Sequence, residues 1–503
     1  MKKICKKMLV LALTMILTMS VITPADAKTT YIKASVKETL LGTLNDSGYS
    51  TKGVKLTVKV TYHKKDISYV KYLAGDQTTS KVKKSGKKLS FDKKTNKASV
   101  TVKKNQTYTF LIVDKKGHSL RKTYSVETYS NPDYADEYKA VWFPYYSYEL
   151  FTEKYKNTEA NFRTFFKGVL KNCKKNNFNC IIVHARAFGD AFYDSDYFPT
   201  SSYIAGTQGK SLSYDPLEVM TEEAHKKGIR IEAWINPYRV SFSDDYSKLS
   251  ADNPARIWHE SSSTKRNVLA YKGRLYYNPA KEEVRELIIN GVKEIVNNYD
   301  VDAIHMDDYF YPSFSSSNYK EVFDYKEYNA SSEKEDGMSI VNYRRKQVNL
   351  LVKGIYSAVK EINPDVEFGI SPAGNIDNLT SKYSYYVDIE EWCSSDDYVD
   401  YICPQIYWGF THTTAPYDSV LKRWISITDQ SKVKLYVGLA AYKVGTTSSS
   451  YPDKKEWNTT TVLRKEIQYG RKKKADGFAV FEYEDLLRSK AKKAVKQMKL
   501  ELQ

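Results

Sequence analysis

Two adjacent aspartates end the apolar segment VDAIHMDDYFYP at residues 301–312. Two acids beside an apolar run cost desolvation free energy unless a partner or a reaction uses them. Cleavage of a glycosidic bond needs two carboxyl groups, one to protonate the leaving oxygen and one to attack the sugar or activate water. A neighbouring carboxylate raises the pKa of its partner, as a general acid requires. Asp307 and Asp308 are therefore candidate catalytic residues, and the alternative is that one of them caps a turn.

Consecutive side chains of a strand point to opposite faces, so we expect only one of the two aspartates to point into a site. Asp307 shares a face with His305 and is the expected inward residue. The candidate second carboxylate is Glu482, which ends the apolar segment GFAVFEYEDL at residues 477–486. The alternative for Glu482 is an exposed acid in a loop.

Amides, arginines and aromatic rings follow the other apolar segments. Amides and arginines bind sugar hydroxyls, and the flat faces of Trp and Tyr suit the C–H faces of sugars. For Asp190 the alternative is a turn cap, for Trp408 it is core packing, and for the arginines it is an ion pair with the aspartates. The expected substrate-binding residues are Arg186, Asp190, Trp234, Asn236, Tyr238, Arg239, His305, Tyr309, Gln405, Tyr407 and Trp408.

These residues require elements that bring them together. Eight apolar segments alternate with segments of helical periodicity, which indicates a parallel sheet with helical crossovers. Eight such units predict a closed (β/α)8 barrel, an α/β fold whose active site lies at the carboxyl ends of the strands. No glycine-rich phosphate-binding motif opens a helix, so we expect no nucleotide cofactor. The expected strands are 138–145, 180–188, 229–237, 301–312, 366–372, 399–408, 434–442 and 477–486.

A segment with a different pattern of apolar and polar residues precedes the predicted barrel. Residues 28–130 contain short segments in which apolar and polar residues alternate, such as VKLTVKVTY at 54–62, and predict a small all-β sandwich. The segment TYTFLIVDKKG at 107–117 resembles the strands of bacterial immunoglobulin-like modules. Residues 131–137 are rich in helix and strand breakers and predict a linker, so the barrel is expected at 138–503.

The first 27 residues have the pattern of a secretory signal peptide. Four lysines precede an apolar stretch, and Ala25-Asp26-Ala27 provides the small residues of a cleavage site. No later run approaches 18 apolar residues, so we expect no integral membrane segment in the mature protein. The alternative is a retained N-terminal anchor. The expected location is secreted or associated with the cell wall.

Positive charge is concentrated before the barrel. The chain has a formal net charge of +18, and residues 28–130 hold 23 Lys and Arg against seven Asp and Glu. Such a field favours polyanions. In an exported protein we expect an anionic wall polymer rather than nucleic acid as the partner of residues 28–130, and the alternative is a solvated lysine-rich surface. The four cysteines after residue 27 fit no zinc spacing, and we expect neither a metal nor another cofactor.

The strand-end motifs also resemble a known family. GDAFYDSDYFP, DPLEVMTEEAHKKGIRIEAWINPYRV, YNPAKEEVRE, VDAIHMDDYFYP, FGISPAGN and VDYICPQIYW are similar, in this order, to the glycosyl-hydrolase-like family ten. This resemblance, from about Lys139 to Leu487, implies a (β/α)8 barrel that hydrolyses a bacterial glycan, with peptidoglycan strands as the leading substrate class. Glu232 and Glu482 depart from the usual family pattern. Within the site, the resemblance carries over to Arg186, Asp190, Asn236, Tyr238, Arg239, Asn278, Asp307, Asp308, Gln405, Tyr407 and Trp408.

Three functions remain open at this point. The first is a glycosidase that uses two carboxyl groups on a wall glycan. The second is a barrel that binds polysaccharide at the cell surface without cleaving it. The third is a metal-dependent deacetylase or hydrolase that uses His184, His305 and the acids, although their spacing matches no common metal motif.

Overall fold

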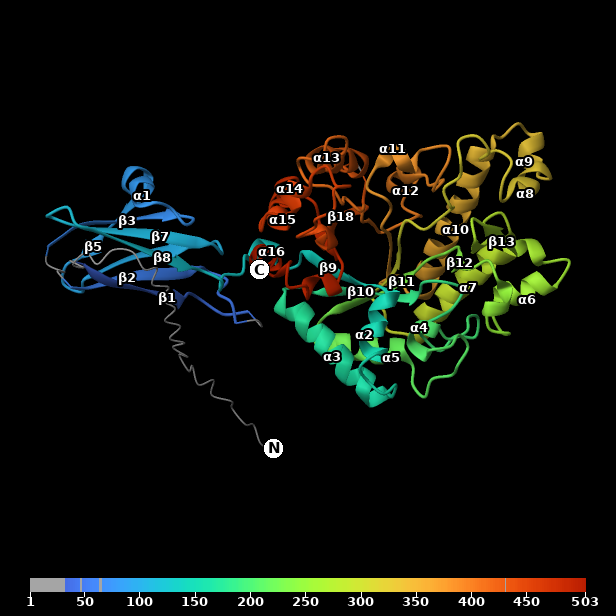
Figure 1. Cartoon of the computed structure of the whole chain (residues 1–503), viewed down its shortest axis with the longest axis horizontal. Helices are drawn as coiled ribbons and strands as arrows, with labels where there is room; N and C mark the ends of the chain where they lie inside the picture. Colours follow the sequence, from blue (N-terminus) through green and yellow to red (C-terminus); the bar gives the residue numbers. More distant parts are fainter. Residues whose placement is uncertain (1–31, 46–47, 63–65, 430) are drawn as a thin grey trace. The chain divides into compact units, whose positions relative to one another are not determined.

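The computed structural model describes residues 32–45, 48–62, 66–429 and 431–503. The expected signal peptide, residues 1–27, lies outside the described residues. The chain divides into two compact units, with the boundary between Tyr129 and Ser130 (Figure 1).

The first unit consists of two antiparallel four-stranded sheets. One has the order β1-β2-β6-β5 and the other the order β4-β3-β7-β8, and a single hydrophobic cluster contains residues of both. The strand Val54–Tyr62 alternates as expected and buries Val54, Leu56, Val58 and Val60. The immunoglobulin-like likeness of these sheets stays a prediction. The elements are β1 (Lys33–Leu40), β2 (Val54–Tyr62), β3 (Ile67–Ala74), α1 (Thr79–Ser85), β4 (Lys87–Leu89), β5 (Phe91–Asp92), β6 (Lys97–Val102), β7 (Thr107–Asp114) and β8 (Ser119–Ser125).

The second unit is a closed barrel of eight parallel strands in the order β9-β10-β11-β15-β16-β17-β18-β19, so the expected (β/α)8 fold is confirmed. Each strand position predicted from the sequence contributes one barrel strand. The sixth is the shortest, because only two residues of the predicted segment 399–408 pair continuously. The strands are β9 (Tyr138–Phe143), β10 (Cys180–Arg186), β11 (Arg230–Ile235), β15 (Ala303–Met306), β16 (Glu367–Ile370), β17 (Tyr401–Ile402), β18 (Lys434–Ala440) and β19 (Gly477–Phe481).

Helices surround the strands (Figure 1). Their starts follow capping rules: Asp215 accepts backbone N–H bonds from Leu217 and Glu218, and Pro216 takes the first helical position of α5. The longer helices are α3 (Glu159–Lys175), α5 (Pro216–Lys226), α7 (Glu282–Asn298), α10 (Ile340–Ile362), α13 (Tyr417–Thr428), α15 (Val462–Lys472) and α16 (Lys492–Glu501). The shorter ones are α2 (Glu149–Thr152), α4 (Ser202–Ala205), α6 (Pro254–Glu260), α8 (Tyr325–Asn329), α9 (Ser332–Glu335), α11 (Ile376–Leu379), α12 (Ile389–Ser394) and α14 (Lys454–Trp457).

The barrel unit has two hydrophobic layers. The larger cluster lies between strands and helices, and a smaller one, which includes Tyr138, Trp142, Trp234 and Tyr401, fills the inside of the ring. Because every second residue of a strand points inward, the inward series on β15 runs Ala303, His305 and then position 307. This series places Asp307 above a packed interior rather than above a pore.

The barrel unit has two further features. The expected linker 131–137 is held on the barrel, because Glu137 forms an ion pair of 2.6 Å with Arg471 and the Arg471 guanidinium lies 3.7 Å from the centre of the Tyr134 ring. A three-stranded sheet in the order β12-β14-β13 interrupts the third βα connection: β12 (Arg239–Ser241), β13 (Val268–Tyr271) and β14 (Arg274–Tyr277). Within the described residues, no helix combines the length and the apolar character that crossing a bilayer requires.

Candidate active site

The two aspartates lie at the carboxyl end of β15. Only 3% of Asp307 is exposed, and Asp308 is half-buried. Burial raises the pKa of both carboxyl groups, and the charge of Asp308 raises that of Asp307 further. The strand ends at Met306, so strict alternation stops there, and both carboxyl groups lie near the Arg239 guanidinium, whose charge lowers both pKa values.

One oxygen of Asp307 also caps a turn, which is the alternative role that the sequence left open for the aspartates. Its Oδ1 accepts the backbone N–H of Tyr309 at 3.0 Å, which fixes the turn after β15. The side chain of Trp234 also lowers the pKa of Asp307, although the indole N–H completes no hydrogen bond of normal geometry with any described residue. The carboxyl group is therefore held in place by the turn and lies beside an indole N–H that is available to a polar atom.

Arg239 brings a cation and aromatic rings to the aspartates. It is the first residue of β12, and its guanidinium lies 4.3 Å from the ring centre of Tyr309 and 4.5 Å from that of Phe188. Tyr309 is 48% exposed and Phe242, 5.3 Å from the same guanidinium, is 45% exposed. Exposed rings around a buried cation form a surface on which a sugar ring can stack.

Gln405 reaches the pair from another strand. Its side-chain Nε2 donates to Asp308 Oδ1 at 3.3 Å and to the Ser371 carbonyl at 3.0 Å. Its backbone bridges Ala373 on one side and Gly438 on the other, so it continues the barrel sheet beyond β17. The rings of Tyr407 and Phe481 lie 6.0 Å apart. Burial raises the pKa of Tyr407, and the charges of both aspartates raise it further, so this ring also lies near the pair. Trp408 is half-buried and packs close to Gly374.

The expected residue His305 lies below the pair, inside the barrel. Its Nε2 accepts the indole N–H of Trp142 at 3.1 Å, and its Nδ1 lies 2.8 Å from the hydroxyl of Tyr401. Tyr401 donates in turn to Glu232 Oε2 at 2.6 Å. Burial lowers the pKa of His305 to about 3, so the ring is neutral and Nδ1 carries the proton. Both ring nitrogens are thus engaged within the protein.

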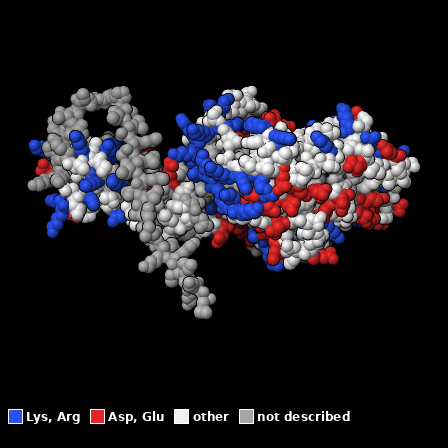
Figure 2. Space-filling view, turned by 90° about the horizontal axis from the view of Figure 1, so that it is seen from below, with Lys and Arg blue, Asp and Glu red and all other residues white. Residues whose placement is uncertain are grey.

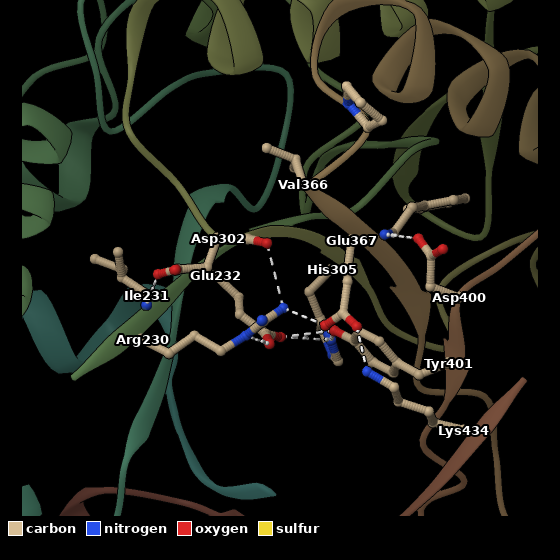
Figure 3. Close-up of polar contacts among 12 residues, drawn as sticks. Arg230, Ile231, Glu232, Asp302, His305, Val366, Glu367, Asp400, Tyr401 and Lys434 are labelled. Atoms are coloured by element: carbon tan, nitrogen blue, oxygen red, sulfur yellow. Dashed lines mark hydrogen bonds and ion pairs between the residues drawn. The ribbon is translucent and has the colours of Figure 1, made fainter. Parts of the chain in front are cut away.

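An ion-pair chain continues from Glu232 to the amino ends of the strands (Figure 3). Arg230 contacts Glu232 at 2.9 Å and Glu367 at 2.6 Å, and Lys434 contacts the other oxygen of Glu367 at 2.6 Å. Each buried charge in this chain has an opposite partner, as burial requires. These ion pairs close the far end of the barrel and support the layer of Trp142, Trp234 and His305 beneath the aspartates.

His184 belongs to the same supporting layer. Its ring stacks on Trp234 with centres 3.3 Å apart, and its Nδ1 accepts the backbone N–H of Tyr145 at 3.0 Å. Burial lowers its pKa well below the usual value, and the neutral ring carries its proton on Nε2, facing Asn236. Among the described residues, no group of three or more His, Cys, Asp or Glu side chains is arranged to hold a metal ion.

Glu482 stands across the ring from the aspartates. It follows β19, and three strands separate β19 from β15 in either direction around the barrel. Burial and the charge of Asp485 raise its pKa to about 8. The other charges that act on it, Glu484 and Arg488, belong to its own turn, and its Oε2 accepts the backbone N–H of Glu484 at 3.2 Å.

Several expected substrate-binding residues have partners within the protein. Arg186 is buried and donates to the carbonyls of Phe188 and Pro237, and Asn278 donates to the Arg266 carbonyl. Asp190 accepts from Gln208, and burial raises its pKa to about 6. Asn236 donates to the Ala187 carbonyl, and Tyr238 packs near Tyr311. These five shape the loops around the mouth, whereas Arg239, Tyr309, Gln405 and Tyr407 lie near the pair.

Sequence reasoning missed Tyr385. The charges of Asp308 and Tyr309 act on its hydroxyl, and burial raises its pKa to about 12, so its ring lies at the mouth. Tyr385 and Tyr386 both have left-handed backbone, with φ of 60° and 55°, which costs about 1–2 kcal/mol for each such residue. The buried Arg344, bonded to Tyr386 at 2.9 Å and to Asp324 at 2.7 Å, holds this turn. Only the run of aromatics YSYY at 383–386 could have signalled it.

Comparison with known proteins gives the family. Residues 139–458 match the glycosyl hydrolase-like 10 family, a span of more than half of the chain. The chain belongs to this family. The match confirms the family resemblance seen in the strand-end motifs and spans the first to seventh barrel strands, so it includes Arg239, the aspartates and Gln405.

Two proteins are similar to this chain in sequence. Glycosyl hydrolase YngK of Bacillus subtilis strain 168 is 37% identical over 316 residues, and glycosyl hydrolase DigH of Escherichia coli strain K12 is 32% identical over 294 residues. The matched segments cover 60% and 55% of this chain, and 60% and 65% of the length of these relatives. Among solved structures, the PgaB (BpsB) glycoside hydrolase domain from Bordetella bronchiseptica matches 72% of this chain and 98% of its own, with 11% identity and a TM-score of 0.46.

Proposed function

We propose that this chain is a glycoside hydrolase that cleaves O-glycosidic bonds with the Asp307–Asp308 pair. The main support for this proposal is the environment of the pair. The two carboxyl groups have raised pKa values, share the Arg239 guanidinium and lie beside exposed aromatic rings at the carboxyl end of a barrel strand. Membership in the glycosyl hydrolase-like 10 family supports the same reaction class.

The environments of the two acids suggest different roles. Asp308 accepts the Gln405 amide N–H, which favours its ionised form, whereas Asp307 is more deeply buried and lies against the charge of Asp308. Two adjacent carboxyl groups that cannot both ionise share one proton. In the proposed reaction Asp307 donates that proton to the leaving glycosidic oxygen, and Asp308 stabilises the positive charge that develops on the sugar ring. Water then adds to the anomeric carbon and loses a proton to the Asp307 carboxylate, which restores the starting state.

Glu482 offers an alternative proton donor. With a pKa raised to about 8 it holds a proton at neutral pH, and it follows the barrel strand that lies opposite β15 in the ring. In that assignment Glu482 protonates the leaving oxygen, and one of the aspartates attacks the anomeric carbon or activates the water that does so.

The proposed substrate is a glycan of the bacterial cell wall, with peptidoglycan strands as the first class to test, and the proposed location is outside the cell. The leader-like residues 1–27 and the family resemblance support this assignment. The excess of lysine in residues 28–130 supports binding of that unit to an anionic wall polymer, in which case it would hold the barrel near its substrate.

Leaving-group dependence separates the two donors. A variant that lacks its general acid keeps activity on an aryl glycoside whose leaving group needs no proton, but loses it on the natural glycan. We expect this split for Asp307→Asn and not for Glu482→Gln. The opposite pattern would transfer the acid role to Glu482, and full activity of Asp307→Asn on the natural glycan would remove the proposed function.

A further inference from the structure

Two helices of the barrel unit carry lysines in stripes. Helix α3 has Lys171, Lys174 and Lys175, and helix α16 has Lys492, Lys493, Lys496 and Lys499. Residues three or four apart lie on one side of a helix, so each set forms one positive stripe. Lys499 is half-buried, and the other six of these lysines are exposed. We call these seven residues the α3–α16 basic surface.

The two stripes belong to one region of the barrel unit. Asn177, just after α3, donates to the Lys499 carbonyl of α16 at 2.9 Å, which joins the ends of the two helices. Figure 2 shows a continuous area of Lys and Arg on this unit, bordered by an area of Asp and Glu, so the charges of the nearly neutral barrel are segregated. Residues 131–503 hold 51 Lys and Arg against 52 Asp and Glu, so a net charge close to zero hides a strongly basic face.

Intramolecular ion pairs do not account for five of these seven lysines. Among the described residues, no carboxylate lies within ion-pair distance of Lys171, Lys174, Lys175, Lys492 or Lys493. Lys171 and Lys175 are one turn apart, and like charges at this spacing destabilise a helix. An external anion would relieve this repulsion.

We propose that the α3–α16 basic surface binds a polyanionic polymer with repeating phosphate groups, of the polyol-phosphate type. Lysine ammonium groups on two stripes suit a flexible chain of point charges, which gains affinity by releasing counterions. In the part of the chain that the structure describes, the large exposed hydrophobic side chains include none from α3 or α16. This surface therefore offers neither an apolar anchor for a lipid bilayer nor exposed rings on which nucleic-acid bases stack.

The position of the surface leaves the candidate active site open. Helix α3 ends at Lys175 and β10 begins at Cys180, so the end of α3 lies at the amino ends of the barrel strands. The aspartates lie at the opposite, carboxyl ends. A polymer bound where the ends of α3 and α16 meet would thus hold the barrel without entering the mouth. This role rests on the proposed location outside the cell but does not require catalysis.

Binding of the full chain to poly(glycerol phosphate) tests the proposal. The variant Lys171→Gln/Lys175→Gln/Lys492→Gln/Lys493→Gln leaves residues 28–130 intact, and we expect its Kd at physiological salt to rise about fivefold to tenfold. The slope of log Kd against log salt should fall by about two or more. The melting temperature should stay equal or rise, because repulsion between Lys171 and Lys175 is relieved.

A matched control removes the same charge elsewhere. Lys353, Lys422, Lys432 and Lys455 are exposed residues of other parts of the barrel unit. Changing these four to Gln should alter the Kd by less than about twofold, since the charges removed do not line the basic surface. Equal weakening by both variants, or no weakening by the first, would overturn the proposal. The proposal would also be overturned if these four lysines contributed more to binding of phosphatidylglycerol vesicles or duplex DNA by the full chain than to its binding of the polymer.

Discussion

The side chain of Gln405 donates a hydrogen bond to Asp308 at 3.3 Å, although the two residues come from barrel strands that are not neighbours. Strand β16 lies between β15 and β17, and Gln405 spans it through its second bond to the Ser371 carbonyl. An amide fixed in this way favours the ionised form of Asp308 and leaves the shared proton on Asp307. The division of roles between the aspartates therefore depends on a residue 97 positions away in the chain.

Replacement of Gln405 by Ala should shift the pH dependence of catalysis. Loss of the N–H donor raises the pKa of Asp308, so the group ionises only at higher pH and the acidic limb of the kcat/KM profile moves upward. We expect activity near pH 5.5 to fall about tenfold, with a smaller loss at pH 8. A pH profile of kcat/KM on a purified glycan measures this effect.

The matching control is Gln468→Ala, since Gln468 bonds Glu501 on the outer helices. Its profile should match that of the wild type. An unshifted acidic limb in the Gln405 variant would mean that the amide does not control the ionisation of Asp308.

The barrel and the aspartates could be predicted from the sequence because both rest on local patterns. Eight apolar segments separated by helical periodicity specify the ring, and the sequence IHMDDY places two acids where an apolar strand stops. The loss of strict inward and outward alternation at Asp308 could not be predicted, since it depends on β15 ending at Met306.

Other parts of the site depend on contacts between distant segments. Arg186, Asp190 and Asn278 have the residue types of a sugar site, yet their partners are loop groups that no local pattern identifies. The position of Tyr385 depends on the buried pair of Arg344 and Asp324, which lie 20 residues apart. Residue type predicts what a side chain can bind, whereas the fold decides whether a protein group already occupies it.

Arg344→Ala should destabilise the barrel unit. Arg344 and Asp324 are fully buried, and removal of the guanidinium leaves a buried carboxylate without its cation. We expect the free energy of unfolding to fall by about 3–5 kcal/mol, measured by urea denaturation. The half-buried neighbour Arg345, bonded to the Thr380 carbonyl, provides the control, and Arg345→Ala should cost less than about 1 kcal/mol. Similar losses for both variants would contradict the role given to the buried pair.

Glu466→Gln should stabilise the protein at alkaline pH. Neither oxygen of the buried Glu466 has a hydrogen-bond partner among the described residues, and burial, with Glu456 and Asp453 nearby, raises its pKa well above the usual value. The unfolded chain ionises this group above about pH 4.5 whereas the folded chain does not, so stability is lost as pH rises through that range, at about 1.4 kcal/mol per pH unit.

The neutral amide of Gln removes that loss. Thermal unfolding should give the variant and the wild type equal melting temperatures near pH 4, with the variant several degrees higher at pH 8. The exposed Glu283 of α7 provides the control, because Glu283→Gln should give no such divergence. A variant less stable than the wild type at pH 8 would show that Glu466 is ionised and paired.

The release of new reducing ends from purified wall glycan tests the role of the aspartates most directly. Wild type, Asp307→Asn and Asp308→Asn are compared after circular dichroism has verified that all three fold alike, with products identified by mass. The account predicts cleavage by the wild type and a rate lower by about a hundredfold or more in each variant. Undiminished turnover by both variants would contradict it.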